Sequence, residues 1–276
     1  DESLGLGGLI ARYVHEGVQV YLICATNGDD GTISPELLNG YDSHAALRLA
    51  ELDCAAEKLR LSRVFKLGYK DSGMMGSPEN DDPDCLWSVW HSRPDEVTRR
   101  VVEVMREIRP QVVITFNKYG GYGHPDHIAI QQAATRAFDL AGDPAYDTPG
   151  LAPHTPQKLY YSGIPTLALR YAIWNLRLRG KNPRKVGRNQ DIDLVRILDN
   201  VDSSHARVDV GAWLDAWDDA TACHVSQGGG RGFMPRWMRR VFGARQAFTR
   251  VHPRPPRDRV DEDDLFAGIM MDGVMR

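Results

Sequence analysis

The hydrophobic pattern over the first two thirds of the chain alternates between two kinds of segment. Segments with apolar residues at helical spacing alternate with short apolar runs rich in β-branched residues, which is typical of a parallel sheet covered by helices. Helices are expected over 4–15, 44–61, 96–108 and 125–140, and strands over 18–26, 63–68, 111–116 and 158–164. This order predicts an α/β fold with a Rossmann-like, mostly parallel sheet and helices on both faces.

The chain opens at Asp1 directly on a helical pattern, without an initiator Met or a leading strand. Since helices in α/β chains normally follow strands, we expect the first strand to be missing from this chain. Residues 1–165 are predicted to form the catalytic core. Residues 166–276 are less regular and are predicted to form a substrate cleft or lid of the same domain.

Two basic segments lie in the C-terminal region. Residues 177–188 have the composition of a basic surface loop, and residues 228–259 hold nine arginines among Gly, Pro and Trp. Solvated loops are the first interpretation of such runs, and contact with an anionic ligand is the alternative.

Charge and cysteine content limit the function classes. The 276 residues include 34 Lys+Arg and 37 Asp+Glu, so the net charge is close to zero. The chain therefore has no overall positive charge that would attract nucleic acid or a membrane surface, and polyanion binding would need a local basic patch. No run approaches the roughly 18 apolar residues of a spanning helix. We therefore expect neither nucleic-acid nor membrane partners. Four isolated cysteines without a CxxC pair predict small buried thiols in a reducing cytoplasm.

The most informative run is YGGYGHPDHI at 119–128, which lies between a predicted strand and a predicted helix. Ligands bind at such junctions in open parallel sheets. Of two histidines around an Asp, one imidazole can hold a metal while the other donates a proton or stabilises an oxyanion. The structural alternative is that His124 caps the helix and Asp126 complements its dipole.

The acidic start, DESLGLGG at 1–8, is the second candidate. Its carboxylates open a helix, and its glycines allow close packing. Dipole complementarity is the structural alternative. A phosphate-binding glycine turn is a weak rival, because the spacing does not fit G-x-G-x-x-G.

Four motifs in order resemble those of the PIG-L/LmbE-like zinc-dependent N-deacetylase family. They are DES-x-G-x-GG at 1–8, TNGDDG at 26–31, GYKDSGM at 68–74 and GHPDHI at 123–128, with weaker echoes in HVSQ at 224–227 and LFAGI at 265–269. The family includes N-acetylglucosaminyl-inositol deacetylases and thiol-conjugate amidases. Its members open with a strand that ends in His-Pro-Asp-Asp-Glu, and Asp1 and Glu2 look like the end of that motif.

The resemblance implies roles for individual residues. Asp1 and His127 would bind zinc, while a further His ligand and an Asp base would precede residue 1. His124 would stabilise the oxyanion or act as the acid, oriented by Asp126, and Tyr122 would lean over the substrate carbonyl.

By the same resemblance, Arg48 and Asp71 would contact sugar hydroxyls. Arg48 could instead form a surface ion pair with Glu51, three residues further along the helix. Asp71 could instead cap the turn before Ser72. His224 could be a contact of the site or a helix cap.

A metal held by two His and one carboxylate keeps an open position for water, and these donors suit Zn²⁺ and also Fe²⁺. Such a centre suits amide hydrolysis, and the resemblance implies that the amide is that of a small N-acetylated amino sugar. The alternatives are an amidase acting on a thiol-sugar conjugate and an inactive α/β module that binds a nucleotide or a sugar. With residues upstream of Asp1 absent, the chain itself is expected to be inactive.

Overall fold

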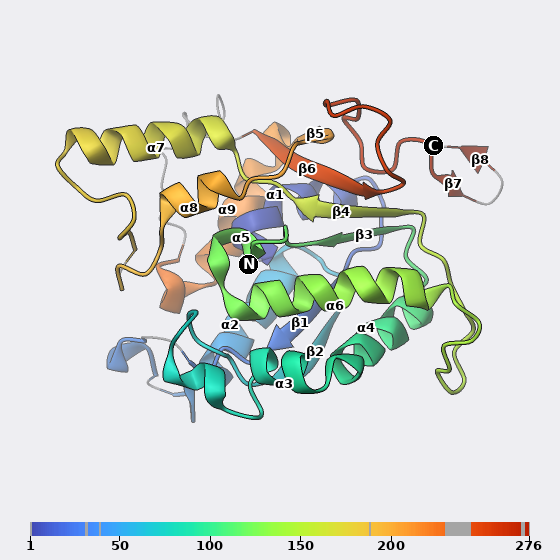
Figure 1. Ribbon diagram of the computed structural model, residues 1–276, viewed down its shortest axis with the longest axis horizontal. Coiled ribbons are helices and arrows are strands. Elements are labelled where there is room, and N and C mark those ends of the chain that lie inside the picture. The colour runs from blue at the N-terminus through green and yellow to red at the C-terminus, as the bar shows by residue number, and fades with distance from the viewer. Residues whose placement is uncertain are drawn as a thin grey trace.

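Two short sheets stand at the centre of the fold, with helices on either side (Figure 1). The computed structural model describes residues 2–30, 33–38, 40–187, 189–229, 244–271 and 274–275. The helices are α1 (Glu2–His15), α2 (His44–Lys58), α3 (Leu86–Ser92), α4 (Pro94–Ile108), α5 (Gly120–Gly123), α6 (Pro125–Ala141), α7 (Thr166–Leu178), α8 (Leu194–Asp199) and α9 (Leu214–Ala222). The strands are β1 (Tyr21–Thr26), β2 (Arg63–Tyr69), β3 (Val112–Thr115), β4 (Lys158–Ser162), β5 (Ala206–Asp209), β6 (Arg245–His252), β7 (Met270–Met271) and β8 (Val274–Met275). Short 3-10 turns are η1 (Pro35–Leu38), η2 (Pro78–Asp81), η3 (Gly211–Trp213) and η4 (Val225–Gln227).

The larger sheet is mixed rather than mostly parallel. Its strand order is β3-β4-β6-β5, in which β3 and β4 are parallel while β6 is antiparallel to both β4 and β5. Strands β1 and β2 form a separate parallel pair. The predicted α/β class and the predicted parallel strands are confirmed. The antiparallel part comes from residues beyond 165, so the predicted division at that residue stays a prediction.

The two faces of the sheets are covered by different helices. On one face, α3, α4 and α6 bury a core with β1 and β2, including Leu67, Val101 and Ala133. On the other, α1 buries Leu9 and Tyr13 against β4, β5 and β6, and α9 packs beside α1. The predicted placement of helices on both faces is confirmed.

The edges of β1 and β3 line a common cavity of about 450 Å³. Residues 21–26 and 112–116 line it from its two sides, and among the described strands none pairs with both. A parallel strand placed between them would satisfy the backbone groups of both edges. The expected additional first strand stays a prediction.

Helix α6 carries the histidines of the 119–128 run, and its start is fixed locally. His124 is the N-cap, and Pro125 occupies the first helical turn, where no backbone N–H is needed. Gly120 has φ of 65°, and a Cβ there would lie 2.9 Å from the Cβ of His127. The glycine therefore lets the preceding turn pack directly against the histidine.

The far end of α6 is held by one buried arginine of α4. The guanidinium of Arg106 donates hydrogen bonds to Thr148 Oγ1 and to the carbonyl oxygens of Leu140, Ala141, Asp143 and Tyr146. The acceptors are the last carbonyl groups of α6 and groups of the loop that follows it. The charge also complements the negative end of the helix dipole.

We expect Arg106→Met to lower the free energy of unfolding by about 3 kcal/mol, because it leaves several buried carbonyl oxygens without donors. Urea denaturation followed by circular dichroism measures the loss. Arg99→Met is the matched control on the same helix, since Arg99 is exposed and makes one hydrogen bond to the carbonyl of Asp147. A loss for Arg106→Met no larger than the control's would contradict this role.

Two of the four cysteines are paired, so the expectation of four unpaired thiols is wrong. Cys54 of α2 and Cys223, directly after α9, form a disulfide across 169 residues of sequence. Cys24 and Cys85 are free thiols, and Cys85 is buried as expected. The cytoplasmic location stays a prediction.

The C-terminal region agrees with one predicted basic loop and differs from the other. Helix α7 ends at Leu178, and residues 179–187 of the loop predicted over 177–188 form no helix or strand, whereas the predicted loop 228–259 contains strand β6. Residues 230–243 of that loop lie outside the described residues. Among the helices that the structure describes, none combines the length and apolar character needed to cross a membrane.

Candidate functional site

One cavity gathers every described residue that the sequence analysis selected. It is the cavity between β1 and β3, and its lining extends past the carboxyl ends of these strands to Asn27, Gly28 and Phe116. Its lining includes Arg48, Asp71, Tyr122, His124, Asp126 and His127. Asp1 lies outside the described residues, but its neighbour Glu2 lines the same cavity. The described residues selected from the sequence therefore lie together in one cavity, and their roles stay predictions.

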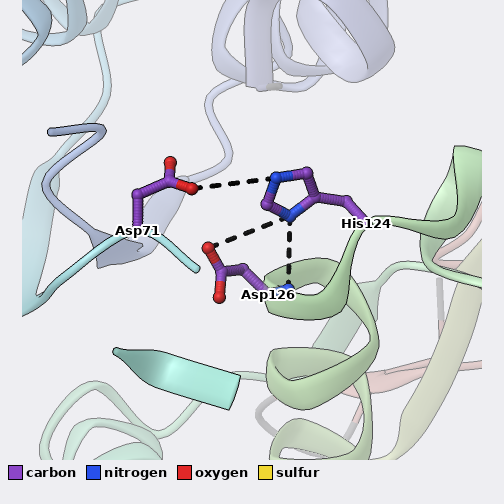
Figure 2. A group of neighbouring side chains, drawn as sticks. All are labelled: Asp71, His124 and Asp126. Carbon is purple, nitrogen blue, oxygen red and sulfur yellow. Dashed lines mark hydrogen bonds and ion pairs between the residues drawn. The ribbon is translucent and has the colours of Figure 1, made fainter. Parts of the chain in front are cut away.

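His124 lies between two carboxylates (Figure 2). Its Nδ1 accepts the backbone N–H of Asp126 at 3.2 Å, so it does cap the helix. Its Nε2 faces Oδ1 of Asp71 at 3.8 Å. A neutral ring whose Nδ1 accepts a hydrogen bond carries its proton on Nε2. Capping and function are therefore compatible, because capping turns an N–H donor toward the cavity.

Asp126 is anchored by the loop after β2. Its Oδ2 accepts the backbone N–H of Ser72 at 3.0 Å, and its Oδ1 accepts the Ser72 hydroxyl in a short hydrogen bond. Ser72 is fully buried and was not singled out from the sequence. These bonds join the GYKDSGM loop to the first turn of α6 and fix the carboxylate beside His124.

The imidazole of His127 is held in one orientation by its neighbours. Its Nδ1 donates to the carbonyl oxygen of Gly120 at 3.0 Å, which makes Nε2 the acceptor nitrogen of the ring. The ring stacks on Phe116 with centroids 4.0 Å apart. Tyr122 lies edge-on to it, at a centroid distance of 5.1 Å. The rings of Phe116 and Tyr122 pack against the imidazole and hold it in one position.

Burial shifts the pKa values of the site. It lowers the pKa of His124 to about 3, helped by neighbouring His127, and it lowers the pKa of His127 to about 4. Both rings are therefore neutral near pH 7. Burial raises the pKa of Tyr122 to about 12, so its hydroxyl keeps its proton.

The two carboxyl groups respond in the opposite direction. Burial, together with the charge of Asp71, raises the pKa of Asp126 to about 7. Burial also raises the pKa of Asp71, against the hydrogen bond from the Gly73 N–H. Buried carboxyl groups close together favour a nearby cation, which would restore their charged forms.

A metal fits the donors present. Among the described residues, ligand atoms of Asp71, His124 and Asp126 lie within 4.8 Å of one another. Hydrogen bonds occupy both oxygens of Asp126 and Nδ1 of His124. The Nδ1 of His127 is oriented by the carbonyl oxygen of Gly120, an arrangement that is common for histidines that bind a metal through Nε2.

Arg48 and Asp71 lie on the same cavity wall. Asp71 also accepts the Gly73 N–H at 2.9 Å, so the turn cap considered from the sequence is present alongside the cavity position. Glu51 is buried, with 5 % of its surface exposed, and it accepts hydrogen bonds from Ser226 N–H and Oγ. Glu51 is therefore not the surface partner of Arg48 that helical spacing suggested.

The HVSQ segment forms another part of the wall. His224 and Gln227 line the cavity, and Nε2 of His224 lies 2.7 Å from Oε1 of Glu2. The glycines after Glu2 serve packing, because a Cβ on Gly7 or Gly8 would meet the ring of Trp217. The phosphate-binding interpretation of this start is therefore not supported.

The fold and the cavity define a hydrolase class in which paired histidines and carboxylates act at the ends of parallel strands. Residues 1–138 match the family model described as PIG-L, GlcNAc-PI de-N-acetylase. The chain belongs to this family. It is an enzyme that hydrolyses amides, an N-deacetylase.

Curated relatives support the assignment across most of the chain. One from Streptomyces griseus is 36 % identical and covers 82 % of this chain and 71 % of the relative. Another from Geodermatophilus obscurus is 36 % identical over 98 % of this chain and 94 % of the relative. Both are named 1D-myo-inositol 2-acetamido-2-deoxy-alpha-D-glucopyranoside deacetylase. The expectation that the chain is inactive is not borne out by this similarity to deacetylases.

Solved structures share the fold. Protein TT1542 from Thermus thermophilus superposes with a TM-score of 0.56 at 22 % identity, covering 95 % of this chain and 92 % of its own. The N,N'-diacetylchitobiose deacetylase from Pyrococcus horikoshii gives 0.59 at 18 % identity, covering 94 % and 84 %. The α/β architecture is therefore shared well beyond the range of high sequence similarity.

Proposed function

We propose that this protein removes the acetyl group from an N-acetylglucosamine unit linked to inositol, a small-molecule substrate. The cavity that unites Arg48, Asp71 and the residues of the 119–128 run is the observation that carries this proposal. The names of the relatives support the inositol conjugate over the alternative of a thiol-sugar amide. Expected products are acetate and a free amine.

We propose one Zn²⁺ per chain, bound by His127 and Asp1, and the same donors would accept Fe²⁺. Bound metal would supply a polarised carbonyl and a water that ionises near neutral pH. Glu2, the residue next to Asp1 in the sequence, lines the same cavity as His127. The raised pKa of Asp126 and of Asp71 supports a cation in this region.

His124 is proposed to stabilise the oxyanion by donating from Nε2, or to act as the acid. Its ring is neutral, and its Nδ1 is held by the backbone of Asp126, so Nε2–H is available as a donor toward the cavity. The carboxylate of Asp126 lies 3.8 Å from Nδ1 and would stabilise a positive ring after proton uptake. The protonated hydroxyl of Tyr122 is a second candidate donor over the substrate carbonyl.

Arg48 and Asp71 are proposed to bind sugar hydroxyls. A guanidinium donates hydrogen bonds and a carboxylate accepts them, so together they suit a polyol with several hydroxyl groups. Both line the cavity at the carboxyl ends of the strands, beside His124.

The direct test is release of amine and acetate from two synthetic substrates, the N-acetylglucosaminyl-inositol conjugate and a thiol-sugar conjugate with an internal amide. We expect the first to be turned over with the higher kcat/KM. A higher kcat/KM on the thiol conjugate would replace the deacetylase proposal with the amidase. No turnover of either would favour a binding protein.

Arg48→Ala is expected to raise KM for the sugar conjugate about tenfold or more, the cost of one charge-assisted hydrogen bond. Activity on a small truncated N-acetyl amide should change little, because the reacting carbonyl is untouched. Arg63→Ala is a control, since Arg63 is exposed and pairs with Glu107 on the surface. Equal losses on both substrates would show that Arg48 is structural.

A further inference from the structure

The disulfide lies directly beside a wall of the cavity. Cys223 is followed at once by residues 224–227, here called the wall segment, which comprises His224 and the 3-10 turn η4. Two of its residues, His224 and Gln227, line the same cavity as Arg48 and His124. The disulfide therefore fixes the chain one residue away from the substrate cavity.

Two buried polar contacts hold the wall segment against the helices behind it. Ser226 donates from its N–H and its Oγ to the carboxylate of Glu51, at 2.7 and 2.6 Å. His224 contacts Glu2 of α1 at 2.7 Å. Ser226 and Glu51 are 9 % and 5 % exposed, so water competes little for these bonds.

The covalent tie joins the same two elements as the polar contact. Cys54 lies on α2 one turn after Glu51. Helix α2 therefore holds the wall segment through the carboxylate of Glu51, and it holds the preceding residue, Cys223, through the disulfide. The carboxylate would remain when the bond opens. The wall segment would then be held by hydrogen bonds alone and would detach more often.

The disulfide is placed where a small thiol can reach it. Cys54 is exposed at the surface of α2, whereas Cys223 is half-buried. Attack by a thiolate on an exposed sulfur is the accessible first step of thiol–disulfide exchange. The remaining thiols, Cys24 and Cys85, are half-buried and buried, so an exposed disulfide is the accessible redox group among the described cysteines.

We propose that the Cys54–Cys223 disulfide is a thiol-exchange site whose opening by a small thiol loosens the wall segment and weakens substrate binding. Only the predicted effect on substrate binding rests on the proposed deacetylase function. The first thiolate attacks Cys54 Sγ, forming a mixed disulfide and releasing the Cys223 thiolate, which takes up a proton. A second thiol attacks the mixed disulfide. Two cysteine thiols form, and two small thiols are oxidised to their disulfide.

The expected effect is on affinity more than on chemistry. The wall segment does not include His124 or His127, so opening the bond leaves them in place. If the wall segment is correctly seated in about one fifth of the reduced molecules, KM rises roughly fivefold. The kcat at saturating substrate should change less, because bound substrate selects the seated form.

The experiment compares the intact protein in glutathione buffers poised oxidising and reducing. Maleimide labelling with mass spectrometry reports the state of Cys54 and Cys223. Hydrogen exchange reports the amide of Ser226, and steady-state kinetics reports KM. The matched control is Cys54→Ser/Cys223→Ser, which keeps Cys24 and Cys85, so any effect of thiols on a bound metal appears in it too.

We expect reduction to raise KM and to speed exchange at Ser226 in the wild type, with both changes reversed on reoxidation. In both buffers, the double variant should show the KM and the Ser226 exchange rate of the wild type whose disulfide has been opened. Free thiols at both cysteines in oxidising buffer would overturn the proposal, as would unchanged exchange and unchanged KM on opening the bond. If no amine is released in any state, the proposed function fails, while labelling and exchange still decide whether the disulfide controls the wall segment.

Discussion

His127→Ala is expected to lose bound metal together with activity, the largest effect of any single change in this site. The substitution removes an imidazole whose Nδ1 is fixed by the carbonyl oxygen of Gly120 at 3.0 Å and which we propose as a metal ligand through Nε2. Loss of a proposed ligand would remove both the cation and the water that it activates, so amine release should fall by roughly a thousandfold or more. Elemental analysis and an amine-release assay on the same sample measure both effects.

His91→Ala is the control, because His91 is exposed on α3 and bonds only locally to the carbonyl of Trp87. It should keep full metal content and activity. A His127→Ala protein that retains metal would contradict the ligand assignment. It would point instead to the cluster of Asp71, His124 and Asp126 as the metal-binding group.

His124→Ala should show the opposite signature, with metal content and KM preserved and kcat lowered by roughly two to three orders of magnitude, as for loss of one oxyanion donor. The geometric reason is that Nδ1 is committed to the N–H of Asp126, which turns Nε2 as a donor toward the cavity. Steady-state kinetics at matched metal content measures the effect.

Asp126→Asn provides a matched comparison for His124→Ala. Asp126→Asn keeps the shape of the side chain but removes the charge that would stabilise a protonated His124, so kcat should fall while metal stays bound. If His124→Ala strips the metal while His127→Ala retains it, the two roles are reversed.

The site was largely predictable because its signals are local in sequence. The 119–128 run contains both histidines, their intervening Asp and the glycine that permits their packing, so a short window defined the arrangement. Arg48 and Asp71 came from motifs of the family resemblance. Their meeting in one cavity follows from parallel strands, whose carboxyl ends share an edge. Their roles stay predictions.

Contacts between distant residues were not predictable. Cys54 and Cys223 are 169 residues apart, and Glu51 and Ser226 are 175 residues apart. Neither pair has a sequence spacing that would identify its two residues as partners. Glu51 looked like a surface partner of Arg48 because helical spacing alone places them together. Only the packing of α9 beside α2 turns Glu51 toward Ser226.

The C-terminal region escaped prediction for a different reason. In α7 only Ile173 is buried, while Leu167, Tyr171, Trp174 and Leu178 are exposed, so its apolar pattern does not mark a core face. In β6 the alternation of Gln246 and Phe248 toward the interior is obscured by flanking arginines. A strand of this kind is recognised only by its pairing with β4 and β5.

The central claim is that this chain is a metal-dependent N-deacetylase, and its most direct test is amine release from the N-acetylglucosaminyl-inositol conjugate before and after metal removal. The protein is stripped with a chelator, dialysed, and titrated with Zn²⁺ while its metal content is measured. We expect activity to vanish on chelation and to return in proportion to zinc, reaching its full value near one zinc per chain. Amine release that persists in metal-free protein, or a zinc-loaded protein that releases none, would contradict the account.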